Sequence, residues 1–252
     1  GSMLILSDSP AVYPNDRNPQ GLRKSSPVIS SVPGQLYDFD PQKTDILRDT
    51  ERIAIQSGTQ PSPIDADQFG NVCPYWLNEF NTGFDHWNVL HRLNWTKNAM
   101  PAAKVAFADL GLDASKTYIV HEFWSGRTLG TVKGSFDLTG IDPMGIQSYA
   151  IRELKDHPQL VSTNRHLSQG AAEVEMLVWD AKTLTLEGRS RVIAGDDYQI
   201  LAHVPDGYKT IAATVDHKPV QPSTDGNLLT VSIKRGDTAS TEWAIRFERT
   251  TR

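Results

Sequence analysis

The stretch Thr117-Tyr118-Ile119-Val120-His121-Glu122-Phe123-Trp124 decides the fold class expected for this chain. Most of its residues are β-branched or aromatic, the types that favour strands, and Ser125-Gly126 ends it with a turn. Short segments of the same texture occur at 87–95, 128–138, 146–154, 173–179, 183–192, 198–204, 210–215, 228–233 and 242–247. Strands repeated every 8 to 12 residues or so, with turns between them, are typical of sandwiches and barrels. The sequence therefore predicts an all-β fold from about residue 84 onward.

Residues 1–83 have a different texture and predict an irregular, proline-rich arm. Gly1-Ser2 is interpreted as a scar of tag removal, and Leu4-Ile5-Leu6 as one short strand. Proline then recurs, and it is rare inside helices and central strands. Only 44–57 has helix-compatible apolar spacing, so we expect at most one or two short helices. An irregular segment of this length is unusual within a self-contained domain and suggests packing against another surface.

The two sets of predicted strands are separated near Lys155-Asp156-His157-Pro158. We therefore expect two β-sandwich-like modules, at 84–155 and 157–252, after the arm at 1–83. The sequence leaves open whether the two modules share one hydrophobic core.

Composition excludes several classes of protein and site. The 252 residues carry a formal net charge of -5, so there is no basic footprint for nucleic acid. No apolar run approaches the roughly 18 residues that a membrane helix needs. Cys73 is the single cysteine, which excludes an internal disulfide framework and a cysteine-rich zinc site. We expect neither a nucleic-acid partner nor a membrane partner.

Several segments, taken in order, resemble the C-terminal β-sandwich region of α-galactosidase-like glycoside hydrolases, the clan of families 27, 31 and 36. They are residues 94–95, 109–112, 118–126, 129–130, 157–170 (HPQLVSTNRHLSQG), 204–208, 225–229 and 243–247. Residues 4–8 are similar to the last strand of the catalytic barrel in those enzymes and are interpreted as its remnant. No single motif is diagnostic, and the order of the segments carries the resemblance.

The resemblance implies a part of an enzyme more than a whole one. The family keeps its catalytic carboxylates on earlier barrel strands, and a complete barrel needs about 250 residues of its own. We therefore expect this chain alone to be non-catalytic, to brace the barrel of the same or a partner chain, and to aid carbohydrate binding. The alternatives are a stand-alone carbohydrate-binding module and an independent glycoside-active enzyme with its site between the β modules.

Location and assembly follow from the same resemblance. It favours a secreted or periplasmic protein, although the printed sequence shows no signal peptide. A hydrophobic face that normally meets a barrel would promote a homodimer. Whether the chain is a fragment of a longer enzyme stays open at this point.

Three residues are candidates for substrate binding. The resemblance places Asp8 near the sugar pocket, although capping a turn before Pro10 is the more ordinary role for this residue. Sugars bind flat aromatic faces, but most tryptophans here lie in strand runs where core packing is usual. Tyr75 and Trp76, at the junction of the arm and the first module, are the exceptions we select.

The sequence predicts no catalytic residue, metal site or cofactor. The seven histidines form neither HExxH nor a close His-x-His pair, and Ser125-Gly126 lacks the leading glycine of a nucleophile elbow. The pair Arg165-His166 is expected to hydrogen-bond a turn. Asn94-Trp95-Thr96 matches a glycosylation sequon, but its predicted position in a strand argues against modification.

Overall fold

The computed structural model describes residues 4–5, 30–31, 62–63, 74–94, 96–165, 168–195 and 197–250. Within these ranges nearly all regular structure is strand, and the helical element is one 3₁₀ turn, η2 (Phe107–Leu110). The predicted all-β, sandwich-like fold class is confirmed. None of the helical structure in the described ranges is long or apolar enough to span a membrane.

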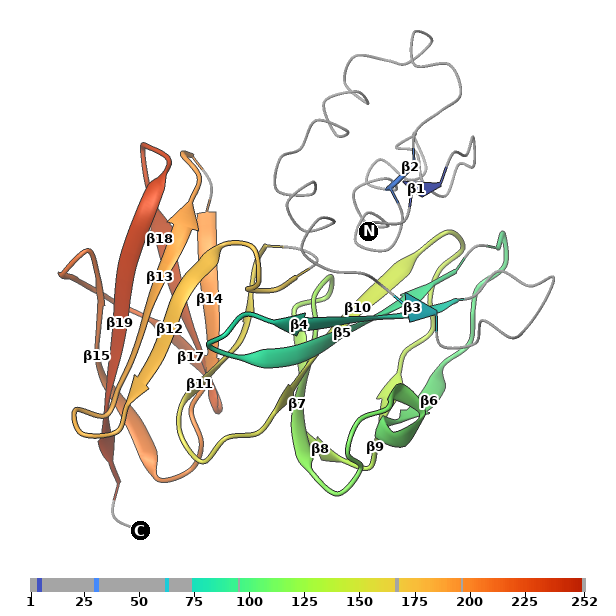
Figure 1. Cartoon of the computed structure of the whole chain (residues 1–252), viewed down its shortest axis with the longest axis horizontal. Coiled ribbons are helices and arrows are strands. Elements are labelled where there is room, and N and C mark those ends of the chain that lie inside the picture. The colour runs from blue at the N-terminus through green and yellow to red at the C-terminus, as the bar shows by residue number, and fades with distance from the viewer. Residues whose placement is uncertain are drawn as a thin grey trace, which may run out of the picture. The chain divides into compact units, whose positions relative to one another are not determined.

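The chain forms two compact units (Figure 1). The first contains the described residues up to Phe80 together with Trp87–Ile151, and the second contains Asn81–His86 together with the chain from Arg152 onward. Each unit has its own cluster of buried apolar side chains. The chain therefore passes between the units after Phe80, after His86 and after Ile151, and the expected module bounds of 84–155 and 157–252 stay a prediction.

A six-stranded sheet forms the larger part of the first unit. Its strand order is β3 (Ser62–Pro63), β4 (Tyr75–Asn81), β5 (His86–Leu93), β10 (Ile146–Glu153), β7 (Thr117–Glu122) and β8 (Arg127–Lys133). Two pairs stand apart from it: β6 (Ala103–Ala106) with β9 (Ser135–Leu138), antiparallel, and β1 (Leu4–Ile5) with β2 (Ser30–Ser31), parallel.

Aromatic rings fill the core of this unit. The Phe107 ring lies 4.4 Å from that of Tyr118 and 5.5 Å from that of Phe136, measured between centroids. Tyr149 on β10 extends this cluster of tilted rings, at 5.6 Å from Phe136. The aromatic and β-branched residues that made 117–124 look like a strand therefore pack the centre of the unit.

The second unit is a sandwich of two antiparallel sheets (Figure 1). The four-stranded sheet has the order β11 (Gln159–Thr163), β14 (Asp197–His203), β18 (Leu228–Lys234) and β17 (Ser223–Asp225). The five-stranded sheet has the order β12 (Val174–Asp180), β13 (Thr185–Val192), β19 (Ala239–Arg249), β15 (Tyr208–Val215) and β16 (Lys218–Val220). The core draws on both sheets, with Ile200 and Val231 from the first and Trp243 and Ile245 from the second.

Strand β13 shows how sequence alternation builds this sandwich. Leu186, Ser190 and Val192 are buried, whereas Glu187 and Arg189 are exposed. Because successive side chains of a strand point to opposite faces, the charged residues line the outer face of the five-stranded sheet.

Two local features differ from the sequence-based expectation. Strand Tyr75–Asn81 lies in the last part of the segment expected to be irregular, where strand-forming aromatic residues follow Pro74. The segment expected as one strand at 128–138 is two, because Gly134 has a φ of +76° and interrupts the extended backbone between β8 and β9. The helix expected within 44–57 and most of the arm lie outside the described residues.

Candidate functional site

The predicted sugar-binding residues do not form one surface. Tyr75 and Trp76 are consecutive on β4 and half-buried, so their side chains point to opposite faces of the sheet. Tyr75 packs against the core of the first unit, and the Arg92 guanidinium lies 5.6 Å from its ring centroid. Asp8 lies outside the described residues. A role for any of the three in substrate binding stays a prediction.

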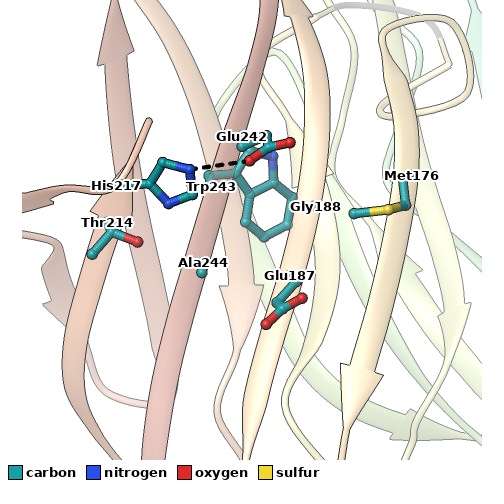
Figure 2. A pocket seen from close by; sticks show the side chains of 8 residues that line it. All are labelled: Met176, Glu187, Gly188, Thr214, His217, Glu242, Trp243 and Ala244. Atoms are coloured by element: carbon teal, nitrogen blue, oxygen red, sulfur yellow. Dashed lines mark ion pairs between the residues drawn. The ribbon is translucent and has the colours of Figure 1, made fainter.

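A hollow of about 230 Å³ lies on the five-stranded sheet of the second unit. Figure 2 shows its lining, which comes from four neighbouring strands and the turn after β15. The lining residues are Met176, Glu187, Gly188, Thr214, His217, Glu242, Trp243 and Ala244.

The strand register explains why the sheet is hollowed at this point. Ala244 of β19 pairs with Glu187 on one side and with Thr214 on the other, so the three form one row across the sheet. Because the middle residue ends at a methyl group, the longer side chains beside it form walls. Glu242 stands two residues along β19 on the same face and closes one end.

The turn between β15 and β16 holds His217 beside this opening. Asp216 and His217 have φ of 45° and 61°, the left-handed values that a two-residue hairpin turn requires. The Asp216 carboxylate accepts hydrogen bonds from the Glu242 backbone N–H, at 3.1 Å, and from the Arg235 guanidinium. His217 Nε2 then lies 3.5 Å from Glu242 Oε2 (Figure 2), and both side chains remain open to solvent, at 89% and 59% exposure.

Trp243 supports the hollow from the core. The side chain is 2% exposed, and its indole N–H donates a 3.0 Å hydrogen bond to Ser190 Oγ. The same hydroxyl oxygen lies 3.1 Å from the Tyr198 hydroxyl, which donates to it. Gly188 pairs with Trp243 across the strands and leaves room for the indole, because a Cβ at Gly188 would lie 2.1 Å from Cζ2. Trp243 is therefore a core residue, as the sequence predicted for most tryptophans.

The chemistry available at the hollow is hydrogen bonding more than metal binding. Among the described residues, no group of three or more His, Cys, Asp or Glu side chains is arranged to hold a metal ion. Carboxylates accept hydrogen bonds, the Thr214 hydroxyl can donate and accept, and Met176 and Ala244 supply apolar surface. Sequence reasoning missed this set because its members become neighbours only through strand register.

The HPQLVSTNRHLSQG motif forms a buried polar network in the second unit. Arg152 is fully buried and donates to Asp85 Oδ2 at 2.5 Å, to the Val161 carbonyl at 2.9 Å and to the Gln169 carbonyl at 2.9 Å. Burial lowers the pKa of Arg152 to about 10. Burial raises the pKa of Asp85, but the positive charges of Arg152 and Lys155 outweigh it, and the net pKa is lowered.

The same motif continues into a second set of buried contacts. Ser162 Oγ donates to Gln169 Oε1 at 2.8 Å, and Thr163 Oγ1 donates to the carboxyl of Glu173. Burial raises the pKa of Glu173. Arg165 lies with its guanidinium 5.6 Å from the Tyr198 ring centroid, while His166 falls outside the described residues. The described motif residues therefore hold their own segment in place.

The stretch around Trp124 is equally structural. The Glu122 carboxylate accepts hydrogen bonds from the backbone N–H groups of Trp124, Ser125 and Ser148, at 3.2, 2.7 and 3.0 Å. Ser148 Oγ lies 3.0 Å from Nδ1 of His91, which is fully buried. Burial lowers the pKa of His91 to about 3, so the imidazole is neutral at ordinary pH.

Asn94 of the sequon is also used within the fold. It is 2% exposed, and its amide donates to the backbone carbonyls of Asn98 and Asp142 at 2.7 and 3.0 Å. Its side-chain oxygen accepts from the Thr96 backbone N–H and hydroxyl. In the folded chain this side chain is closed to a glycan, which agrees with the structural interpretation of the sequon.

No known family model and no curated protein matches the chain, but solved structures do. Isomalto-dextranase of Arthrobacter globiformis T6, solved with panose, is 12% identical, with a TM-score of 0.35 over 90% of this chain and 44% of the other. α-Galactosidase I of Mortierella vinacea is 16% identical, with a TM-score of 0.31 over 48% and 31%.

A third similar structure is the GH27 β-L-arabinopyranosidase of Geobacillus stearothermophilus, 12% identical with a TM-score of 0.33 over 51% of this chain and 28% of the other. The chain therefore spans less than half the length of each of these three glycoside hydrolases. The roles of individual residues rest on the geometry given above.

Proposed function

We propose that this chain is the non-catalytic β-sandwich portion of an α-galactosidase-like glycoside hydrolase, where it braces a catalytic barrel and aids carbohydrate binding. One observation carries the proposal: the polar residues at the centre of two family-like motifs, Glu122 in one and Gln159, Ser162 and Thr163 in the other, are buried and hydrogen-bonded within their own unit. The motifs that carry the resemblance are therefore scaffold motifs.

The state of Glu122 and Arg152 illustrates this argument. A carboxylate that acts as acid, base or nucleophile must reach a substrate, and glycosidases need two such groups on either side of one bond. The Glu122 carboxylate is buried and accepts hydrogen bonds from three backbone N–H groups. The Arg152 guanidinium, also buried, donates hydrogen bonds to Asp85 and to two backbone carbonyls. These groups stabilise loops and are not positioned to meet a sugar.

The packing of the tryptophans gives less support to a stand-alone module that grips sugars on an aromatic face. Trp87 and Trp243 are at most 2% exposed. The Trp179 ring is stacked on His157, with centroids 5.0 Å apart and an angle of 3°. The Trp124 ring meets the edge of Phe123 at 5.0 Å. These four rings are used in packing.

Two experiments test the proposal. The coding region upstream of Met3 should continue into a catalytic barrel, and a natural start at Met3 would overturn the assignment. The purified chain should not hydrolyse p-nitrophenyl α-galactoside or p-nitrophenyl β-L-arabinopyranoside. Turnover by the chain alone would favour an independent enzyme, and Asp8→Ala would then show whether Asp8 takes part.

A further inference from the structure

We infer that the hollow around Ala244 is a carbohydrate subsite that holds one sugar ring of a longer glycan. The choice of a sugar as ligand rests on the proposed function, while the position of the site rests on the geometry of the five-stranded sheet. Neither the motifs nor the solved structures assign a role to this surface.

The size of the hollow fits one ring and no more. Pockets that enclose a small molecule usually measure about 300 to 1,000 Å³. At about 230 Å³ and open on one side, this hollow can cover one face of a ring while the rest of the chain stays in solvent. An open subsite of this kind predicts weak binding, with a Kd of about 1 mM.

The polar groups are spaced to receive a ligand between them. Glu187 pairs with Ala244, whereas Glu242 lies two residues away on the same strand, so the two glutamates are diagonal neighbours. Diagonal positions are about 7 to 8 Å apart at the backbone. The two carboxylates can thus accept hydrogen bonds from hydroxyls on two sides of a ring, with the Thr214 hydroxyl beside them.

The floor supplies the apolar contact that a ring also needs. The Ala244 methyl group lies on the middle strand of the lining, and Met176 of β12, on the far side of β13, supplies a flexible thioether at the edge of the hollow. Because sugar rings present C–H groups on their faces, a small apolar floor with polar walls matches both kinds of surface.

The fold places the polar groups before any ligand arrives. Left-handed backbone is unfavourable at residues other than glycine, and both Asp216 and His217 adopt it. The bonds from Glu242 N–H and Arg235 to Asp216 hold that turn, and the turn places His217 Nε2 3.5 Å from Glu242 Oε2. Part of the ordering cost of binding is therefore met by the fold.

The test is a titration of the full chain followed by ¹H–¹⁵N NMR, with methyl α-galactopyranoside, methyl β-L-arabinopyranoside and panose as probes. At least one probe should shift the amides of Glu187, Thr214, Glu242 and Ala244 with a saturable dependence. Ala244→Leu fills the hollow from outside the core and should weaken binding at least tenfold. Ala212→Leu, on the same face but outside the hollow, is the matched control and should bind like the parent chain.

Three other outcomes of the titration would overturn the inference. No shift of these amides with any probe up to about 50 mM, a concentration well above the expected Kd, would overturn the inference. Binding that survives Ala244→Leu would place the sugar elsewhere, and saturation of the same amides by CaCl₂ with none by sugars would assign the hollow to a cation. These results are independent of what lies upstream of Met3, so the subsite and the proposed function can fail separately.

Discussion

Replacing Gly188 by alanine tests how tightly the inner face of the five-stranded sheet is packed. A Cβ built at Gly188 would lie 2.1 Å from Cζ2, 2.4 Å from Cε2 and 2.7 Å from Cη2 of Trp243. Such contacts are well inside van der Waals distance, so the indole must move by roughly an ångström or more. It cannot move freely, because it is 2% exposed and hydrogen-bonded to Ser190.

The expected loss of stability follows from three contributions. Overpacking of a core costs about 1 to 3 kcal/mol and occasionally more. Displacement of the indole also weakens its bond to Ser190, which is worth about 1 kcal/mol. Alanine restricts the unfolded chain and returns about 0.4 to 1 kcal/mol. We therefore expect Gly188→Ala to lower the free energy of unfolding of the second unit by about 2 kcal/mol.

Urea denaturation followed by tryptophan fluorescence measures this change. Gly236→Ala is the matched control, because a Cβ at Gly236 meets nothing within 4 Å and its φ is outside the left-handed region. Trp243→Leu makes room for the added methyl group, so Gly188→Ala should cost much less in that background. Equal stability of the Gly188→Ala and Gly236→Ala variants would refute the packing argument.

Two further perturbations test the buried polar groups. Asp85→Asn leaves the buried Arg152 guanidinium without its counter-charge and should lower the free energy of unfolding by about 3 to 5 kcal/mol in the same denaturation assay. The control Asp137→Asn, which removes an exposed ion pair with Lys104, should lower it by less than about 1 kcal/mol. Equal losses for the two variants would contradict the assigned role of the buried pair. Burial lowers the pKa of His91 to about 3, so below about pH 6.5 the unfolded chain binds a proton at this residue that the folded chain does not bind. As the pH is lowered from roughly 8 to 5, this difference at His91 reduces the free energy of unfolding by about 2 kcal/mol. Thermal melts across this range should show a shallower pH dependence for His91→Asn than for the parent chain; parallel curves for the two proteins would show that His91 does not cause it.

Features that depend on neighbours in the chain could be predicted from the sequence. The strand at Thr117–Glu122 follows from β-branched and aromatic residues, and the turn at Gly207 follows Pro205-Asp206 and has a φ of +89°. The strand at Tyr75–Asn81 escaped prediction because the prolines around it favoured an irregular segment. The division of 128–138 into two strands at Gly134 was not predicted, because a single glycine within a strand pattern is compatible with either a bulge or a break.

The sequence by itself determined the all-β class and the positions of most strands, because alternation and turn residues act locally. The tertiary structure decided the candidate site. Glu187, Thr214 and Ala244 lie on three separate strands, and only the pairing of β13 with β19 and of β19 with β15 places them in one row. A shift of one residue would turn each strand over and bury its charges, so the hollow depends on register, which hydrophobic packing of the whole sandwich determines.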